Sequence, residues 1–331
     1  MEKLEIESVQ KVLEQAIAKR KTLIQAPYET AFRLLNGFLE DLPQVVIEIF
    51  GKTVVCHDYS PKGILGEQLV PLITEQLSWI QTGIVKKRRS KDPRQQAGKI
   101  VFGDSPDTTI IENNVRYAID LTMNQDASFY LDTRELRTWL TKNMTNKRVL
   151  NTFAYTGSLG VAAWASGAKE VVQLDLNKRF LSVAKQSAKL NGFPCKDNMY
   201  QTADFWSRLN HFKAIKSYFD CVILDPPVYS KTSKATIDIT KNYHKLINKV
   251  RPLIVDGGML VTINNALFQS GESHYQVLEA LCQDGYLKIE AIIPIPADCI
   301  GGSRLPKNRL PEDPAPYNHS TKITILSIKK K

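Results

Sequence analysis

The chain has 331 residues, a formal net charge of +10 and a hydrophobic content of 43%, which suits a globular protein of two domains. No apolar run approaches the ~20 residues of a membrane span, and the polar N-terminus is unlike a secretory signal. Five scattered cysteines without a CxxC pair argue against structural zinc or a disulfide framework. We therefore expect a cytoplasmic protein without a metal site or a membrane partner.

The first part of the chain is predicted to form a small α+β domain over residues 1–123. Helical spacing and strand alternation follow one another along it. In chain order we expect a helix over about the first 30 residues, a hairpin over 44–59, a helix over 65–84, a basic loop over 86–94 and a hairpin over 108–120 that turns at Asn113-Asn114. The basic loop, KKRRSKDPR, holds six basic residues against one acid and favours a polyanionic partner over a merely solubilising surface.

Residues 124–331 change to an alternation of strands and helices, which predicts a parallel, doubly wound, Rossmann-like sheet. We expect strands at 149–153, 171–175, 199–202, 221–224 and 259–263, with helices at 158–165, 178–190 and 243–254. The segments 287–296 and 322–330 leave no room for a helix of normal length between them. They are predicted to pair as an antiparallel hairpin at one edge of the sheet.

Several residues after these strands indicate a nucleotide site. Gly157 and Gly160 lie in a turn that opens a helix, where backbone can approach a ligand closely. Asp175 ends the next strand, the usual place for an acid that takes ribose hydroxyls. Asp204 and Asp225 follow the third and fourth strands. With no complete GxGxxG and an antiparallel final hairpin, this pattern favours S-adenosylmethionine over a nicotinamide cofactor.

These motifs resemble class I S-adenosylmethionine-dependent RNA methyltransferases, specifically the bacterial large-subunit (23S) ribosomal RNA methyltransferases with C5-cytosine and N7-guanine branches. The matching strings are SFYLDTRELR (128–137), NTFAYTGSLGVAA (151–163), VVQLDLNKRFL (171–181), LNGF (190–193), TADFW (202–206) and LDPPVYSK (224–231). Residues 33–59 resemble the small domain that precedes catalysis in the same group. The resemblance covers most of the chain.

The resemblance implies a role for each matching residue. The cofactor-binding set is Asp132, Arg134, Phe153, Tyr155, Thr156, Gly157, Asp175, Leu176, Asp204, Phe205 and Asp225. The catalytic set is Asp225, Pro226, Pro227 and Tyr229, with stiff prolines and a tyrosine that stacks on the extruded base. The PUA domain that often opens these proteins has no room here. RNA contact therefore shifts to the small domain and to Lys86, Lys87, Arg88 and Arg89.

The methylated atom depends on a nucleophile. Enzymes that methylate cytosine C5 need a cysteine to saturate the ring. In those relatives the cysteine follows the fifth strand, where this chain has Asn264 and Asn265. Guanine N7 or an exocyclic amine of ribosomal RNA, free or in a ribosomal particle, is therefore favoured. The alternatives are a cytosine-C5 enzyme, a nicotinamide-dependent dehydrogenase and a non-catalytic RNA-binding protein. A homodimer is compatible with the sequence.

Overall fold

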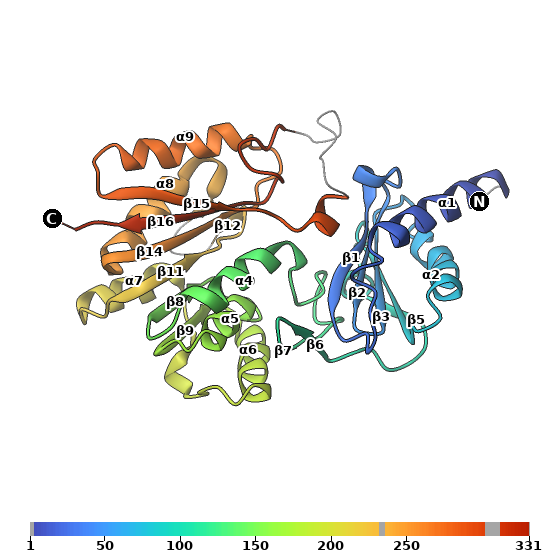
Figure 1. Ribbon diagram of the computed structural model, residues 1–331, viewed down its shortest axis with the longest axis horizontal. Coiled ribbons are helices and arrows are strands. Elements are labelled where there is room, and N and C mark those ends of the chain that lie inside the picture. Colours follow the sequence, from blue (N-terminus) through green and yellow to red (C-terminus); the bar gives the residue numbers. More distant parts are fainter. Residues whose placement is uncertain (1–2, 232–235, 302–311, 331) are drawn as a thin grey trace. The chain divides into compact units, whose positions relative to one another are not determined.

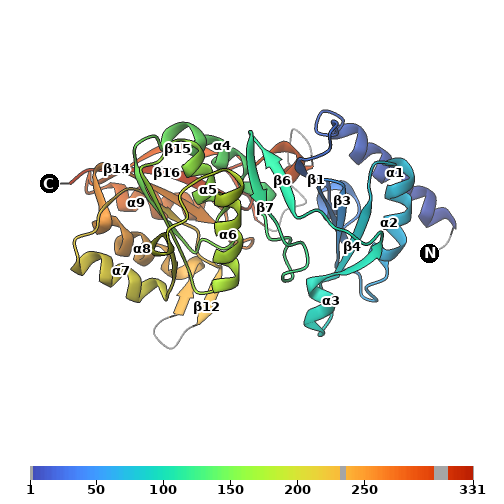
Figure 2. The same cartoon turned by 90° about the horizontal axis from the view of Figure 1, so that it is seen from below.

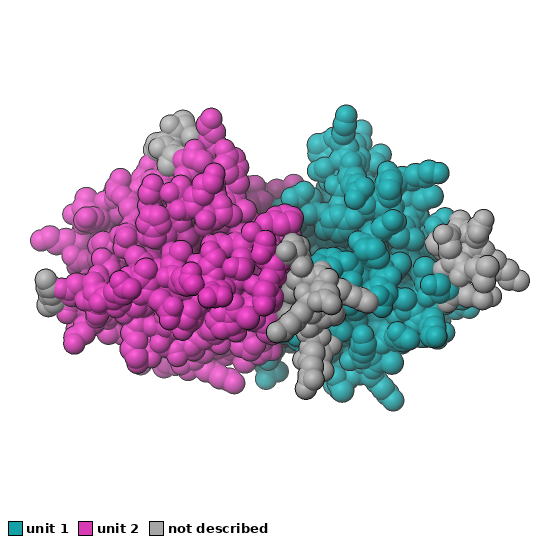
Figure 3. Space-filling model, turned by 90° about the horizontal axis from the view of Figure 1, so that it is seen from above, with its two compact units in different colours: residues 1–132, 296–309 teal, residues 133–295, 310–331 magenta. Residues whose placement is uncertain are grey.

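The computed structural model describes residues 3–231, 236–301 and 312–330, with side chains from residue 8 onward. It forms two compact units, coloured separately in Figure 3. Their described parts are residues 3–132 and 296–301 for unit 1, and residues 133–231, 236–295 and 312–330 for unit 2. The contacts thus divide the chain nine residues later than the predicted boundary after 123, and they assign a second segment to unit 1. No helix among the described residues combines the length and apolar character needed to cross a bilayer.

Unit 1 is built on a five-stranded sheet with the order β1-β2-β3-β4-β5 (Figure 1). Its strands are β1 (Ala31–Asn36), β2 (Val45–Phe50), β3 (Thr53–Asp58), β4 (Thr82–Lys87) and β5 (Lys99–Phe102). Its helices are α1 (Lys3–Lys19), α2 (Leu65–Gln76) and the short α3 (Pro93–Ala97). All neighbouring strands are antiparallel except β3 and β4, which α2 connects. A separate hairpin joins β6 (Thr109–Glu112) to β7 (Val115–Ala118).

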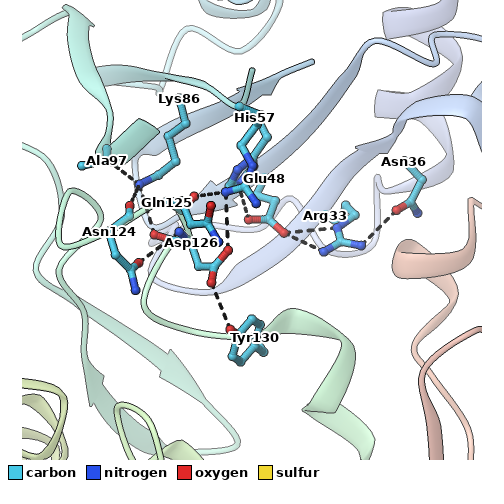
Figure 4. A network of polar contacts seen from close by, with 11 residues as sticks. Arg33, Asn36, Glu48, His57, Lys86, Ala97, Asn124, Gln125, Asp126 and Tyr130 are labelled. Carbon is cyan, nitrogen blue, oxygen red and sulfur yellow. Dashed lines mark hydrogen bonds and ion pairs between the residues drawn. The ribbon is translucent and has the colours of Figure 1, made fainter. Parts of the chain in front are cut away.

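The two faces of this sheet differ in chemistry because successive side chains of a strand point to opposite faces. One face packs against α1 and α2 in a hydrophobic core that includes Leu13, Ile47 and Leu69. Charged side chains from β1, β2, β3 and β4 interact on the sheet through a polar network, shown in Figure 4: Arg33, Glu48, His57 and Lys86. The sheet therefore combines an apolar core with a buried polar network.

Most of the predicted elements of unit 1 form, but two helices are shorter than expected. The hairpins β2–β3 and β6–β7 are confirmed, and Asn113 and Asn114 both adopt positive φ at the second turn. The first helix ends at Lys19, well before residue 30. The helix expected over 65–84 ends at Gln76, because residues 82–87 pair with β3 in parallel instead.

Unit 2 contains a seven-stranded sheet with the order β10-β9-β8-β11-β14-β16-β15. The strands are β8 (Arg148–Thr152), β9 (Glu170–Asp175), β10 (Tyr200–Thr202), β11 (Phe219–Leu224), β14 (Ile254–Asn264), β15 (Leu287–Ile293) and β16 (Lys322–Ile328). The first five run parallel, and β16 is antiparallel to both β14 and β15. This confirms the Rossmann-like fold and its final antiparallel hairpin.

Helices cover both faces of this sheet (Figure 2). They are α4 (Arg134–Asn143), α5 (Ser158–Ala165), α6 (Lys178–Leu190), α7 (Phe205–Ala214), α8 (Ile239–Val250) and α9 (Gly271–Cys282). The main core joins α7, α8 and α9 to the strands, while α4, α5 and α6 pack together on the opposite face. The helix predicted to reach residue 254 ends at Val250, since residue 254 begins β14. A small hairpin, β12 (Tyr229–Lys231) with β13 (Thr236–Asp238), was not predicted.

A buried histidine on α9 supports the loop after β14. His274 is fully buried, and its Nδ1 lies 3.0 Å from Nδ2 of Asn264. Burial, reinforced by the nearby charge of Lys322, lowers the pKa of His274 to about 3. The imidazole is therefore neutral in the folded protein over the whole physiological pH range, and it can accept a hydrogen bond from the Asn264 amide.

This histidine should make stability depend on pH. Below its ordinary pKa of 6.5, unfolded His274 binds a proton that the folded protein excludes down to about pH 3. Its contribution should lower the free energy of unfolding by up to about 1.4 kcal/mol for each pH unit of acidification in this window. Lys322 adds no slope there, because its folded pKa of about 8 keeps it protonated in both states.

Urea unfolding of the wild type and of His274→Gln between pH 4 and 7 measures this contribution. The glutamine keeps an acceptor for Asn264 but does not titrate, so the variant should show a flatter pH dependence. His211→Gln, at an exposed position on α7, is the control. Parallel pH profiles for the wild type and His274→Gln would contradict the assignment.

Candidate active site

The carboxyl ends of the parallel strands of unit 2 meet around a small cleft. Its volume is about 30 Å³. It is lined by Phe153, Leu174, Asp175, Leu176, Ala203, Asp204, Phe205, Trp206, Ser230 and Ile237. Five of these residues belong to the cofactor-binding set predicted from the sequence: Phe153, Asp175, Leu176, Asp204 and Phe205. The structure therefore brings together predicted residues that follow three different strands.

The loop between β8 and α5 has an unusual backbone. Phe153, Tyr155 and Gly157 all have positive φ, at 54°, 50° and 76°. Such angles are uncommon for residues with a Cβ and are found where surrounding contacts enforce them, often at ligand-binding sites. Here the N–H of Tyr155 donates to Oδ2 of Asp175 at 2.9 Å, and the Phe153 ring stacks on Phe205 at 4.6 Å.

The two glycines of this loop serve packing rather than the close ligand approach that the sequence suggested. A Cβ on Gly157 would lie 2.4 Å from Cβ of Ala184, which belongs to α6. A Cβ on Gly160 would lie 2.3 Å from Nε2 of Gln173 in β9. The Gln173 amide in turn donates to the Gly157 carbonyl at 3.0 Å. Both positions need glycine because neighbouring protein atoms occupy the space of a side chain.

Asp175 is the best-anchored acid of the cleft. Its Oδ1 accepts from the N–H of Asn177 at 2.8 Å, while Oδ2 accepts from Tyr155. Burial raises the pKa of this carboxyl, and the backbone hydrogen bonds oppose that rise. Each carboxylate oxygen can accept a second hydrogen bond, so the fixed group can bind a pair of hydroxyls. Leu176 follows it with 58% of its surface exposed, an apolar wall beside the acid.

Asp204 begins α7 as its N-cap. Its Oδ1 accepts from the N–H and the hydroxyl of Ser207, both at 3.0 Å. Because the cap uses Oδ1, the second oxygen, Oδ2, remains for a donor on a ligand in the cleft. Phe205 and Trp206 follow at the start of the helix and complete an aromatic wall.

Asp225 follows β11 at a point where a buried tyrosine joins two strand ends. The hydroxyl of Tyr243 lies 2.8 Å from the Ile263 carbonyl and 3.4 Å from the Leu224 carbonyl. Burial, together with the nearby charge of Asp225, raises the pKa of Tyr243 well above its ordinary value. The tyrosine therefore stays neutral and ties the end of β11 to β14. Pro226 is buried beside this contact.

Tyr229 lies on the far side of β12 from the cleft. Ser230 lines the cleft, and strand alternation directs its neighbour Tyr229 the other way. The ring is 63% exposed. Pro227 and Val228, between Asp225 and this strand, are also exposed. The tyrosine is thus separated from the cleft by a single strand residue.

Two other predicted cofactor residues, Asp132 and Arg134, do not line the cleft. Asp132 lies in a short 3-10 helix, Leu131–Thr133, and Arg134 is the first residue of α4. Tyr155, Thr156 and Gly157 also lie outside the lining, although their loop borders it. Their predicted contacts with a cofactor stay predictions.

The four basic residues predicted to contact RNA have different environments. Lys86 is fully buried, and its ammonium group donates to the carbonyls of Ala97, Asn124 and Asp126, so the prediction that it contacts RNA is wrong. Lys87 forms an ion pair with Glu67 at 2.9 Å. Arg88 donates to the Gln125 carbonyl and lies 3.4 Å from Asp126. Arg89 is exposed.

The loop after β14 shows which residues could reach a substrate. Asn264 is buried, with its side-chain oxygen accepting from the N–H of Ala266 and its amide near Gln269 and His274. Its role is to shape the loop. Asn265 is exposed, as are Leu267 and Phe268.

Some functional residues were missed by sequence reasoning. Trp206 sits in the motif TADFW and could have been added from its position. Ser230 and Ile237 line the cleft only because β12 and β13 pair, and a four-residue segment between three-residue strands leaves a weak hairpin signal. Tyr243 gave only a helical, apolar signal.

Comparison with known proteins identifies the family. A family model described as S-adenosylmethionine-dependent methyltransferase matches residues 79–274, more than half of the chain. Among curated relatives, ribosomal RNA large subunit methyltransferase I of Vibrio cholerae is 31% identical over 263 residues, covering 76% of this chain and 65% of its own length. The protein of the same name from Aeromonas salmonicida is 28% identical over 256 residues, covering 76% of this chain. This chain spans 64% of that relative's length.

Solved structures share the fold. A protein from Streptococcus mutans described as a SAM-dependent methyltransferase superposes with a TM-score of 0.82 at 20% identity, covering 98% of this chain and 81% of its own. SMU.776, described as a methyltransferase and solved with SAH, gives a TM-score of 0.84 at 21% identity, covering 98% and 82%. The strand order, the cleft and the family match lead to one conclusion: the chain belongs to the S-adenosylmethionine-dependent methyltransferases and is a class I enzyme of that family.

Proposed function

We propose that this enzyme methylates a base of large-subunit ribosomal RNA. The curated relatives that carry this name support the substrate, and they align with 76% of the chain. The observation that carries the proposal is the arrangement around β12, where Ser230 lines the cofactor cleft and Tyr229 is exposed on the other side. A planar aromatic side chain presented one residue from a cofactor cleft suits a base removed from its stack.

The residues of the cleft fit S-adenosylmethionine, which supplies an activated methyl group on a sulfonium. Asp175 would accept from the two ribose hydroxyls, and Oδ2 of Asp204 would accept from the adenine amine. Phe153, Leu176 and Phe205 supply apolar walls for the adenosine rings. The free N–H groups at the start of α5 suit the methionine carboxylate. The two acids and the apolar walls match the polar and apolar parts of adenosine.

The rest of the site would hold the base. The Tyr243 clamp fixes the end of β11, and the two prolines restrict the backbone between Asp225 and β12. Asp225 would accept from an amino group of the base or of the methionine. Tyr229 would stack on the base plane. Methyl transfer requires an in-line arrangement of acceptor and methyl, so this stiffness contributes directly to rate.

A ring nitrogen or an exocyclic amine is the proposed acceptor. Cys221 is buried within β11, and burial raises the pKa of its thiol to about 12, which leaves it protonated and unreactive. In the described part of the chain, neither the loop after β11 nor that after β14 contains a cysteine. Guanine N7 is therefore favoured over cytosine C5, which remains the alternative. Family membership replaces the dehydrogenase and non-catalytic alternatives.

Loss of the Asp175 carboxylate should weaken cofactor binding. Asp175→Ala removes charge-assisted hydrogen bonds to the ribose, and we expect a loss of about 2–3 kcal/mol in binding free energy. Calorimetric titration with S-adenosylhomocysteine measures it. Asp197→Ala, an exposed acid of the same unit, is the matched control. Unchanged affinity in Asp175→Ala would remove this residue from the site.

Methylation should proceed without a covalent adduct. We expect each of the five single Cys→Ser variants to retain methyl transfer to ribosomal RNA. Because no thiolate attacks the ring, RNA containing 5-fluorocytosine should give no protein–RNA adduct on a denaturing gel. A variant that loses activity, together with an adduct in the wild type, would establish the cytosine-C5 alternative instead.

Tyr229 should act on RNA and not on the cofactor. Tyr229→Ala removes a stacking contact worth about 1–3 kcal/mol and should slow methyl transfer, while Tyr229→Phe keeps the ring and should be nearly silent. Calorimetry with S-adenosylhomocysteine should show unchanged affinity in both variants. Tyr218→Ala, an exposed tyrosine before β11, is the control. If Tyr229→Ala leaves transfer intact, or weakens cofactor binding equally, the proposed stacking role is wrong.

A further inference from the structure

We propose that unit 1 carries a second RNA contact: a cavity of about 180 Å³ that binds one unpaired nucleobase of the substrate. The inference rests on the proposed action on RNA and adds a specific subsite to it. The cavity is lined by residues of β1, β2 and β3, by Arg88 after β4 and by residues 126–131. It is separate from the cleft of unit 2, with which it shares no residue.

A charged triad forms the floor of the cavity. Oε1 of Glu48 accepts from Nη2 and Nε of Arg33 at 2.8 and 3.2 Å, and Oε2 lies 3.0 Å from Nε2 of His57. Burial opposes ionisation of Glu48, but Arg33 and His57 outweigh it and hold its pKa at about 2. The carboxylate thus fixes both partners. His57 uses Nε2 in this contact, and no described residue engages Nδ1, which remains for a ligand.

Lys86 builds the opposite wall. Its ammonium group donates to the carbonyls of Asn124 and Asp126 at 2.9 and 3.1 Å, which holds residues 124–126 against the sheet (Figure 4). Asp126 then receives Arg88 at 3.4 Å and the hydroxyl of Tyr130 at 3.1 Å. The buried lysine therefore shapes the cavity instead of contacting RNA, and the wall is held by side chains from two directions.

Tyr59 supplies a surface for stacking. The ring is 37% exposed and lines the cavity, and the Arg88 guanidinium lies 5.7 Å from its centroid. Aromatic rings and guanidinium planes are the side chains on which proteins stack unpaired bases. A base that enters the cavity would meet this ring on its face and the Arg33–Glu48–His57 triad on its edge.

The charges of the lining point to a base over other ligands. Arg33 and Arg88 are balanced by Glu48 and Asp126, so the cavity offers no net positive charge to a free phosphate. Both carboxylates already have cationic partners, which leaves them poor ligands for a metal ion. An entirely apolar ligand would leave the charged edge without partners. A neutral, planar ring with polar edges satisfies the aromatic wall and the charged floor together.

The size and the surroundings agree with this ligand. The volume equals that of roughly six water molecules, at about 30 Å³ each, which suits one ring system and excludes a duplex. Immediately after Arg88 the chain presents three exposed basic residues, Arg89, Lys91 and Arg94. These lie where the phosphates flanking a bound base would need compensation.

The first test uses the full-length protein and mononucleotides. The imidazole NMR signal of His57, assigned through its loss in His57→Gln, should shift when CMP, UMP, AMP or GMP is added. At least one base should be preferred, because the edge carries donors and acceptors. The shift should persist in Asp175→Ala, which lies in the other unit. Inorganic phosphate that moves the signal as much as the nucleotides would overturn the inference in favour of a simple anion site.

The second test measures binding of single-stranded ribosomal RNA fragments to stacking variants. Tyr59→Ala should weaken the Kd by about 10-fold, a typical loss for one stacked base, and Tyr59→Phe should bind like the wild type. Phe102→Ala, at an exposed aromatic of β5, is the matched control. If Tyr59→Ala binds no worse than Phe102→Ala, the subsite does not exist.

Methyl transfer by the same proteins separates this inference from the proposed function. A failure of the subsite alone would leave the wild type methylating ribosomal RNA, with Tyr59→Ala equally active and no His57 shift. A failure of the proposed function alone would leave the His57 shift and the Tyr59 effect on RNA binding in place, without methylation of ribosomal RNA. Raised KM with unchanged kcat in Tyr59→Ala is the expected result, since the cavity binds RNA away from the reacting atoms.

Discussion

Parallel pairing of five strands in unit 2 is the constraint on which the active site depends. Leu224 of β11 pairs with both Thr152 of β8 and Thr262 of β14, and Asp175 of β9 pairs with Thr202 of β10. Strands in parallel register end at one edge, so the loops that follow them must converge. Residues far apart in the sequence therefore surround one cleft, and only local contacts are needed to orient their side chains.

Unit 1 uses its sheet differently, by burying charge. Removing Arg33, Glu48, His57 and Lys86 from water is costly, and such groups persist only where each finds partners. Here the partners are fixed by strand pairing and by residues 124–126, so the buried groups define a shape as well as a set of hydrogen bonds. Replacing them by apolar side chains could preserve folding, but it would remove the polar edge that a base requires.

The sequence predicted what depends on local pattern and missed what depends on distant partners. Helices α5 and α6 have the predicted bounds, since glycine and polar caps mark their ends. The strand β4 was read as the end of a helix, because its apolar residues fit both periods and its partner β3 is distant. Lys86 was read as exposed for the same reason: its three carbonyl acceptors come from residues 97, 124 and 126. The motif glycines were recognised, but the reason for them lies in Gln173 and Ala184.

The short strand β12 couples the two halves of the proposed reaction. Ser230 borders the cofactor cleft and Tyr229 is directed to solvent, so one peptide unit separates the side that would bind the methyl donor from the side that would bind the acceptor. A displacement of β12 would move both together. Tyr243 holds the end of β11 just before the prolines, which limits such movement at its source. Since an in-line transfer loses rate steeply when the acceptor is misplaced, the buried hydroxyl of Tyr243 connects the stability of the core to the rate of the reaction.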